Sequence, residues 1–296
     1  MKEKKQILFE KEYPEYNCMR IHFDVLDSTQ LFCKRNKKFF IKSGKLKENN
    51  TIVISCNMQT NGIGTRDTKQ NIDRYWLSDK GNLFISFIFL WNKNQMNIIN
   101  CLAQSCTVAI SKTIEYYNLE TQIKWINDVL INYKKIAGCL VNLQYLDDIK
   151  FTDIYTNNVY IICGIGINVE LMDDCNLLTK NFTSIKKELI NCSYEKKKCS
   201  IPSVEQVTEK LIENFFFTIN KLCNHGFSSL LDYISIRLLY KEKKVVIDQD
   251  NHIIVGYLED LSDDGSIILL EEQTRKIVYI NHGHLFSYEQ WKKFIK

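Results

Sequence analysis

The stretch Tyr-Ile-Ile-Cys-Gly-Ile-Gly-Ile-Asn at residues 160–168 is an apolar run that ends in a polar residue, and it predicts a buried strand. Glycine inside a strand is unfavourable unless another group lies close to the backbone. A bound ligand or a packing neighbour would each explain Gly164 and Gly166. A longer apolar run, residues 83–91, predicts the central strand of the same sheet.

The remaining pattern up to residue 240 alternates between short strands and helices. Residues 95–118 place apolar side chains at helical spacing, which predicts a core-facing helix. Residues 132–134 predict a hairpin turn. We expect further strands at 21–26, 51–57, 122–126, 129–131 and 136–144, further helices at 30–40, 204–222 and 227–239, and an exposed loop near 191–200.

From residue 243 onward the pattern changes to short strands. These are expected at 245–247, 253–258, 267–271 and 276–280. Asp263-Asp264-Gly265 is suited to a tight turn between two of them. We therefore predict an α+β protein with two domains, a mixed sheet flanked by helices at residues 1–240 and a small β-barrel at residues 241–296.

Composition sets limits on the function. The net charge of +4 is spread over 39 basic and 35 acidic residues, which is weak evidence for nucleic-acid binding and is compatible with anionic ligands. The 11 cysteines are odd in number and form no Cys-x-x-Cys pair, so most are expected to be small buried apolar residues in a reducing compartment.

No apolar run is long enough to span a membrane, and the charged start lacks the features of a signal peptide. A cytoplasmic location is therefore expected, with a plastid or mitochondrion as the alternative. We expect no membrane partner.

Two polar segments near the N-terminal end carry candidate binding residues. Asp27-Ser28-Thr29-Gln30 has helix-capping chemistry, and its hydroxyl groups also suit a small polar ligand. Residues 59–66, Gln-Thr-Asn-Gly-Ile-Gly-Thr-Arg, begin a long turn-rich stretch in which Gly-x-Gly allows a close approach to an anion. The segment matches neither a Rossmann fingerprint nor a Walker loop. Each segment also has a purely structural interpretation, as a cap or a turn.

A third segment places charged side chains at the end of a predicted strand. Lys124-Trp125-Ile126-Asn127-Asp128 is followed across the predicted hairpin by Lys134-Lys135-Ile136-Ala137-Gly138. Cations and a carboxylate that share one cleft are what a phosphate with Mg²⁺ requires. A surface hairpin with solvated charges is the alternative.

In this order and spacing, the four segments resemble the biotin protein ligase (holocarboxylase synthetase) family. The resemblance runs from about Asp27 to Asn168, with a weaker similarity in the C-terminal barrel. It implies a catalytic domain like those of class II aminoacyl-tRNA synthetases and biotin ligases, followed by an SH3-like barrel. It also implies ATP-dependent activation of biotin to biotinyl-5'-AMP and transfer to a lysine of a carrier domain.

The resemblance implies roles for individual residues. Biotin-binding positions would be Ser28, Thr29, Gln59, Gly62, Lys135, Gly138, Gly164 and Gly166. Nucleotide-binding positions would be Arg66, Arg74, Trp76, Asn82, Lys124, Asn127 and Asn168. Lys135, Asp128 and Arg66 would be catalytic, and Asp128 would also hold Mg²⁺.

The glycine-rich loop departs from the family pattern. The usual Gly-Arg-Gly-Arg reads Gly62-Ile63-Gly64-Thr65 here, so both expected arginines are missing. Arg66 and Arg74 are the nearby substitutes, and the spacing from Gly64 to Trp76 is longer than usual. We expect residues 59–81 to act as a lid that shields the adenylate from water.

The expected partner is the biotin carboxyl carrier domain of acetyl-CoA carboxylase or a related carboxylase, and a homodimer is a further expectation. The alternatives are a lipoate-protein ligase, which uses similar chemistry, and a non-catalytic biotinyl-adenylate binder or regulator. Only 26 residues precede Asp27, too few for a winged helix, so no DNA partner is expected.

Overall fold

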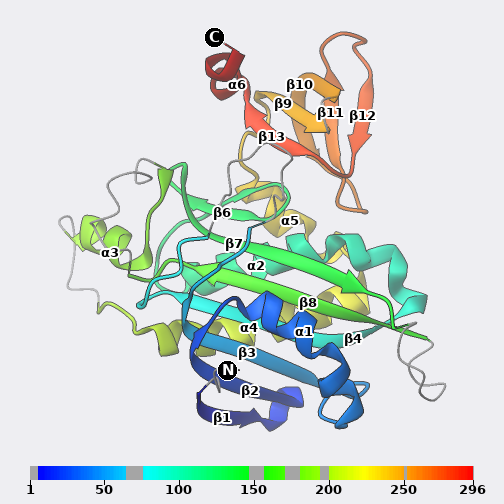
Figure 1. Ribbon diagram of the computed structural model, residues 1–296. Coiled ribbons are helices and arrows are strands. Elements are labelled where there is room, and N and C mark those ends of the chain that lie inside the picture. The colour runs from blue at the N-terminus through cyan, green and yellow to red at the C-terminus, as the bar shows by residue number, and fades with distance from the viewer. Residues whose placement is uncertain are drawn as a thin grey trace.

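The computed structural model describes residues 6–64, 76–146, 157–170, 181–193, 200–249 and 252–295. Its strands form two separate sheets, one large and mixed, the other small and antiparallel (Figure 1). The predicted α+β class is therefore confirmed. None of the helices in the described ranges combines the length and apolar character needed to cross a bilayer.

The large sheet has eight strands in the order β1-β2-β3-β4-β8-β7-β6-β5. Strands β2 and β3 pair in parallel, and the other neighbours pair antiparallel. The strands are β1 Ile7–Tyr13, β2 Cys18–Leu26, β3 Thr51–Gln59, β4 Leu83–Asn92, β5 Gln122–Lys124, β6 Asp128–Ile131, β7 Lys134–Gln144 and β8 Asn158–Ile167. Of these, the exposed edge strand β1 had no counterpart in the sequence prediction.

Helices cover both faces of this sheet, which explains why the central strands are apolar throughout. On β4, Phe87 packs with α2 and α4 in one core cluster, whereas Phe84 and Ile88 belong to a second cluster under α1. The helices are α1 Thr29–Lys42, α2 Leu102–Glu115, α3 Ile185–Ser193, α4 Val204–His225, α5 Ser228–Arg237 and α6 Tyr288–Ile295, with the 3-10 helices Pro14–Tyr16 and Lys93–Cys101.

Two predicted boundaries are wrong. The helix expected at 95–118 is a 3-10 helix followed by α2, because Gln95 has non-helical backbone angles and Asn118 adopts a left-handed φ of 59° after the last turn. The exposed loop expected near 191–200 begins later, because α3 continues to Ser193. The rest of that stretch, residues 194–199, lies outside the described residues.

The second sheet begins at Lys244 and has the order β12-β11-β10-β9-β13, with all neighbours antiparallel. Its strands are β9 Lys244–Gln249, β10 His252–Leu261, β11 Ile267–Glu271, β12 Ile277–Ile280 and β13 His284–Ser287. Five antiparallel strands are consistent with the predicted SH3-like domain. The boundary at residue 240 stays a prediction.

The tight turn between β10 and β11 joins the two sheets. Gly265 has a φ of 81°, a conformation that favours glycine. Its carbonyl oxygen accepts hydrogen bonds from Gln104 Nε2 at 2.7 Å and Trp125 Nε1 at 3.1 Å. The predicted Asp-Asp-Gly turn is confirmed, and it also anchors the small sheet on the large domain.

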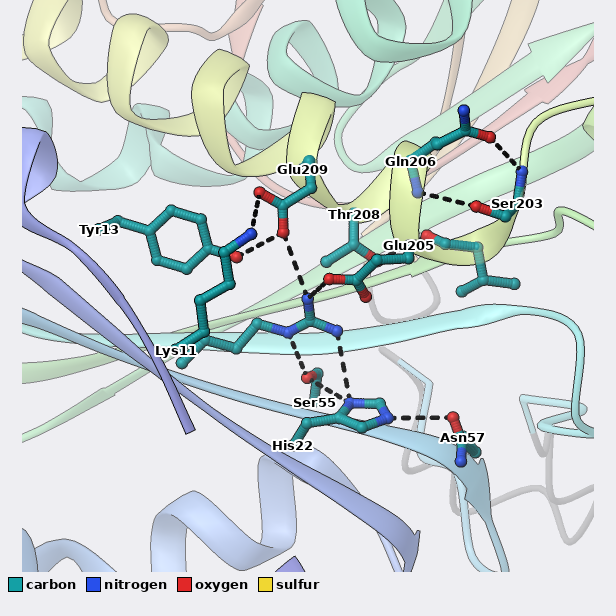
Figure 2. Close-up of polar contacts among 12 residues, drawn as sticks. Lys11, Tyr13, His22, Ser55, Asn57, Ser203, Glu205, Gln206, Thr208 and Glu209 are labelled. Atoms are coloured by element: carbon teal, nitrogen blue, oxygen red, sulfur yellow. Dashed lines mark hydrogen bonds and ion pairs between the residues drawn. The ribbon is translucent and has the colours of Figure 1, made fainter. Parts of the chain in front are cut away.

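A buried polar network fixes α4 to the first strands of the large sheet. Arg20 on β2 is 2% exposed, and its Nη1 lies 2.7 Å from Glu205 and 3.6 Å from Glu209 on α4. Its Nε donates to Ser55 Oγ on β3 at 2.8 Å. Figure 2 shows His22 between Ser55 and Asn57, with both glutamates on the helix above.

The described cysteines are free thiols, and seven of the nine are buried: Cys18, Cys33, Cys56, Cys101, Cys106, Cys139 and Cys163. The prediction that most cysteines are small buried residues is confirmed for this part of the chain.

Candidate active site

A cleft opens where the start of α1 and the end of β3 meet the glycine-bearing parts of β7 and β8. Its position follows from the sheet order, because β4 and β8 carry the centre of the sheet and α1 crosses over them. The lining residues are Ser28, Thr29, Gln30, Gln59, Ile63, Gly64, Trp76, Phe84, Asn127, Lys135, Gly138, Cys139, Leu140, Gly164, Ile165 and Gly166. Each of the four segments singled out in the sequence contributes some of these lining residues.

Ser28, Thr29 and Gln59 form a polar corner in the lining of the cleft. Ser28 is the N-cap of α1, as predicted, and its Oγ accepts from the Leu31 backbone N–H at 3.5 Å. The Thr29 backbone N–H donates to Gln59 Oε1 at 2.9 Å, and Gln59 Nε2 donates to Ser78 Oγ at 2.9 Å. Hydrogen bonds thus fix this polar corner, and Ser28 and Thr29 are 1% and 3% exposed.

Lys135 also lines the cleft, and Asp128 lies beside it. Asn132 and Tyr133 have φ angles of 49° and 63°, so β6 and β7 are joined by the two-residue turn of a tight hairpin. The pairing register shifts between Val129 and Leu130, because Val129 pairs with Ala137 whereas Leu130 pairs with Lys135.

This bulge determines where the lysine points. Side chains alternate along a strand, so Leu130 and Asp128 share one face of the sheet. Because the shift places Lys135 opposite Leu130, its side chain lies on the face that carries Asp128. Lys135 Nζ lies 2.6 Å from Asp128 Oδ1, with the two side chains 26% and 22% exposed.

The three lining glycines on β7 and β8 lie close to side chains of the same protein. A Cβ on Gly164 would lie 2.6 Å from Gln30 Nε2, and one on Gly166 would lie 2.7 Å from the Trp76 indole. A Cβ on Gly138 would lie 3.1 Å from the end of Lys135 and 3.2 Å from Asp128 Oδ1. The sequence left two explanations for a glycine in a strand, a bound ligand or a packing neighbour. The packing neighbour is present at these positions.

Asn127 lines the cleft and its Nδ2 donates to the Cys139 carbonyl oxygen at 2.8 Å. Asn82 and Asn168, two other predicted nucleotide-binding residues, form hydrogen bonds with backbone groups and do not line the cleft. Asn82 Oδ1 accepts from the Val169 and Glu170 backbone N–H groups at 2.9 and 3.2 Å. Asn168 Nδ2 donates to the Thr183 carbonyl oxygen at 3.0 Å.

The remaining predicted residues lie beside the cleft or outside the residues that the structure describes. Lys124 lies on β5 opposite Asp128, 5.8 Å from the Phe286 ring of the small sheet, and does not line the cleft. Gly62 packs against Ser78 and the Trp76 carbonyl next to the cleft. Residues 65–75 of the expected lid, which include Arg66 and Arg74, lie outside the described residues.

Several lining residues were not singled out in the sequence. Gln30 stood in the first segment without a role, and Phe84, Leu140 and Ile165 belong to apolar strands where nothing marks one residue from the next. Cys139 lies beside Gly138, and its neighbour Cys106 together with burial raises the pKa of its thiol well above the ordinary range. This argues for a packing role for Cys139.

A mixed sheet with a glycine-lined cleft, followed by a small antiparallel sheet, is the fold of the biotin protein ligase catalytic domain and its C-terminal domain. Residues 23–168, 146 of the 296 residues, match the model of the biotin/lipoate A/B protein ligase family, so this segment is a domain of that family. The resemblance seen in the sequence is thereby confirmed.

Individual relatives agree with this assignment. The bifunctional ligase/repressor BirA of Bacillus spizizenii is 31% identical over 159 residues, which cover 52% of this chain and 41% of the relative. The biotin protein ligase from Aquifex aeolicus, solved with biotin and ATP, superposes with a TM-score of 0.66 at 23% identity over 90% of this chain and 97% of that one. A biotin protein ligase-like protein of unknown function from Silicibacter sp. TM1040 has a TM-score of 0.59 at 11% identity, over 92% of this chain and 97% of that one.

The two solved structures show the fold alone. The match spans less than half the length of the Bacillus relative, and the repressor part of that relative's name is said of that protein only. The expectation that this chain has no DNA partner stays a prediction.

Proposed function

We propose that this chain is a biotin protein ligase that forms biotinyl-5'-AMP from biotin and ATP and then transfers biotin to a lysine of a carrier domain. The observation that carries the proposal is the Lys135–Asp128 pair at a cleft that also contains the polar Ser28–Thr29–Gln59 corner. A cation beside a carboxylate, together with hydrogen-bonding groups elsewhere in the lining, suits an acid whose polar head and reacting carboxylate are separated by an apolar chain.

The first step, formation of the adenylate, needs positive charge next to the α-phosphate of ATP. When the biotin carboxylate attacks the α-phosphate of ATP, pyrophosphate leaves and negative charge builds on the phosphoryl oxygens. Among the described residues that line the cleft, Lys135 alone is cationic. Its ammonium group would hold the carboxylate and the α-phosphate together and offset that charge.

Magnesium fits this site only together with the nucleotide. No group of three or more His, Cys, Asp or Glu side chains in the described ranges is arranged to hold a metal. Mg²⁺ commonly binds through one or two carboxylates plus substrate phosphates, and Asp128 would supply such a carboxylate. Bound there, the ion would add further positive charge to the phosphates.

The second step needs a neutral amine. A free lysine has a pKa of about 10.4, so deprotonating it at pH 7 costs roughly 4–5 kcal/mol. Asp128 would accept or orient that proton when the carrier lysine attacks the acyl carbon, and AMP would leave. The lysine amine and the carboxylate must reach the same end of the cleft for this step.

The glycine-rich loop differs from the family pattern in a way that bears on the nucleotide. Ile63 and Gly64 line the cleft, so an apolar side chain stands where the family has an arginine. We propose that Arg66 or Arg74 meets the phosphates instead, and that the stretch around them acts as the lid over the adenylate.

The proposed partner is a biotin carboxyl carrier domain of acetyl-CoA carboxylase or a related carboxylase. A homodimer and a cytoplasmic or organellar location remain part of the proposal. The second candidate function is a lipoate-protein ligase, which the shared family name of residues 23–168 favours. A binding-only protein is the third, and the retained Lys135–Asp128 pair argues against it.

One experiment tests these candidates together. The purified chain is incubated with ATP, Mg²⁺ and a carboxylase carrier domain, with labelled biotin in one arm and labelled lipoate in the other. We expect label on the carrier lysine in the biotin arm only. Transfer of lipoate would favour the second function, and binding of biotin with neither adenylate formation nor transfer would favour the third.

A further inference from the structure

The β-bulge that orients Lys135 is held by backbone hydrogen bonds from residues that follow β8. Ile136 is the extra residue of β7 at the register shift opposite β6. Its carbonyl oxygen accepts from the Asn168 backbone N–H at 2.9 Å, and the Lys135 carbonyl oxygen accepts from the Thr183 backbone N–H at 3.0 Å. The two carbonyl groups of the bulge are therefore both fixed by partners outside β6.

The residues that hold the bulge are also joined to each other. Asn168 Nδ2 donates to the Thr183 carbonyl oxygen at 3.0 Å. Phe182 forms a parallel bridge with Lys135. Residues 182–185 thus run along the start of β7 and lead directly into α3, which lies at the end of the large sheet where β7 begins (Figure 1).

Glu188 is a buried acidic residue that the proposed mechanism does not use. It lies in the first turn of α3 and is 5% exposed. Its Oε1 accepts a hydrogen bond from the hydroxyl group of Thr183, which is fully buried. A buried hydrogen bond restricts both side chains, and removing one partner leaves the other unsatisfied. The Glu188–Thr183 bond therefore restrains the segment that meets the Lys135 backbone.

Capping of α3 does not require this bond. The Ser184 hydroxyl accepts from the Lys187 backbone N–H at 3.2 Å, and the Ser184 carbonyl oxygen accepts from the Glu188 backbone N–H at 3.0 Å. Ser184 thus begins the helix without the Thr183 hydroxyl or the Glu188 carboxyl group. What the additional side-chain bond does is tie the helix to the segment that lies on β7.

We propose that Thr183 and Glu188 are positioning residues that act on adenylate formation through Lys135. This inference rests on the proposed function. Neither residue lines the cleft. The bulge sets the direction of the lysine side chain, and the hydrogen bonds that run from Glu188 through Thr183 hold the bulge. Precise placement matters, because a displacement of about 1 Å of a group in an active site can cost about 100-fold in rate.

The test removes the hydrogen bond from each side in turn. Thr183→Val keeps the shape of the side chain without the hydroxyl, and Glu188→Leu lacks the acceptor. Biotin-dependent ATP–pyrophosphate exchange by the full chain gives kcat and KM for each variant. We expect kcat to fall by about tenfold or more in both variants and KM for biotin and ATP to stay within about twofold, because the lysine meets charge that develops in the transition state. Thr183→Ser, which keeps the hydroxyl, should retain most of the activity.

A double-mutant cycle shows whether the effect passes through Lys135. In a Lys135→Met background the ammonium group is already absent, so Thr183→Val and Glu188→Leu should cause little further loss of kcat. A general structural role would lower kcat by the same factor in both backgrounds. That result, or an unchanged kcat in the two single variants, would overturn the proposal.

The matched control is Thr121→Val. The Thr121 hydroxyl also donates to a glutamate, Glu115 Oε1 at 2.8 Å, and Thr121 is 6% exposed, but it precedes β5 and does not line the cleft. Urea unfolding gives the stability of every variant. We expect Thr121→Val to lose stability and to keep the kcat of the unaltered chain. An equal loss of kcat in this control would assign the effect to stability alone.

The unaltered chain separates this failure from that of the proposed function. If it catalyses no biotin-dependent exchange, both proposals are wrong. If it is active and Lys135→Met is impaired, whereas the Thr183 and Glu188 variants match the unaltered chain, only the positioning proposal is wrong. Should Thr183→Val fail to fold, Glu188→Leu removes the same hydrogen bond from the other side and provides the same test.

Discussion

Lys135 Nζ lies 2.6 Å from Asp128 Oδ1 because a β-bulge turns the lysine onto the face of the aspartate. Both side chains are about a quarter exposed, so the pair contributes little to stability. The pair holds a cation and a carboxylate next to each other at the cleft. A substrate carboxylate or phosphate can replace Asp128 as the partner of Lys135 with little loss of folding free energy.

Replacing Lys135 should therefore separate catalysis from folding. For Lys135→Met we expect adenylate formation to fall by about 100- to 1000-fold, because the cation that meets the phosphoryl charge is lost. The free energy of unfolding should change by less than about 1 kcal/mol. ATP–pyrophosphate exchange and urea unfolding measure the two effects, and Lys134→Met, its neighbour outside the cleft lining, is the control. Normal pyrophosphate release by Lys135→Met would contradict the assignment.

The role of Asp128 can be resolved by separating the two steps. In Asp128→Asn, we expect transfer from preformed biotinyl-5'-AMP to the carrier to slow by at least tenfold near neutral pH, because the proton acceptor is lost. The deficit should shrink as the pH rises, since more of the carrier lysine is then neutral. Single-turnover transfer followed across pH measures this. A deficit confined to adenylate formation would instead assign Asp128 to the metal alone.

The sequence predicted the strands of the sheet and the residues of the cleft better than the contacts between their side chains. Apolar runs such as residues 83–91 report burial directly, so the central strands were found, whereas β1 has six exposed residues and no alternation to reveal it. The glycines at 164 and 166 were found as positions of close approach, but the groups that approach them, Gln30 and Trp76, lie far away in the sequence. Strand spacing carries no information on such partners. The Arg20 network was missed for the same reason, since its members come from β2, β3 and α4.

Gly166 should be sensitive to the smallest substitution. A Cβ at this position would lie 2.7 Å from the Trp76 indole, which is too rigid to yield as a flexible chain does. For Gly166→Ala we expect a displaced indole, a changed tryptophan emission and a loss of biotin affinity of at least tenfold. Ile161→Val on the same strand, outside the cleft lining, should cost about 0.5–1.5 kcal/mol of stability and leave affinity unchanged. An unaltered emission spectrum for Gly166→Ala would argue against the packing described here.

Two arginine ion pairs in this protein should differ in their energetic value. Arg20 is 2% exposed and lies between α4 and the sheet, whereas Arg35 is 49% exposed and pairs with Asp27 on the surface. Removing one partner of a buried pair leaves the others without compensation, so Arg20→Leu should cost about 3 kcal/mol of unfolding free energy. Arg35→Leu should cost less than about 1 kcal/mol. Equal midpoints in urea unfolding for the two variants would show that the network does not hold α4.

His22 should make stability depend on pH through the same network. The imidazole is 8% exposed and stacks on Phe9, with the ring centroids 4.7 Å apart. Arg20 Nη2 can only donate, so His22 Nδ1 must accept, and the proton is on Nε2, which faces Asn57 Oδ1 at 3.0 Å. A second proton on Nδ1 would lie between the Ser55 hydroxyl, at 2.8 Å, and the guanidinium group, at 3.4 Å, and would place a second positive charge next to Arg20.

Burial and the Arg20 charge both lower the pKa of His22 below its ordinary 6.5, and this outweighs the opposite effects of Asn57, Glu205 and Asp24. The unfolded chain therefore binds a proton at a higher pH than the folded protein does. The contribution of His22 to stability is fully present above pH 6.5 and is lost as the pH falls from 6.5 through the folded-state pKa.

Urea unfolding at a series of pH values between 5.5 and 7.5 measures this effect in a window above the pKa range of the carboxyl groups. We expect the free energy of unfolding to decrease toward pH 5.5, and the decrease to be smaller in His22→Gln, which has no titrating group at this position. His225→Gln, at the exposed end of α4, should keep the full pH dependence. If His22→Gln shows the same slope as the unaltered chain, the pH dependence comes from another group, because a neutral amide cannot take up the proton that the unfolded histidine binds.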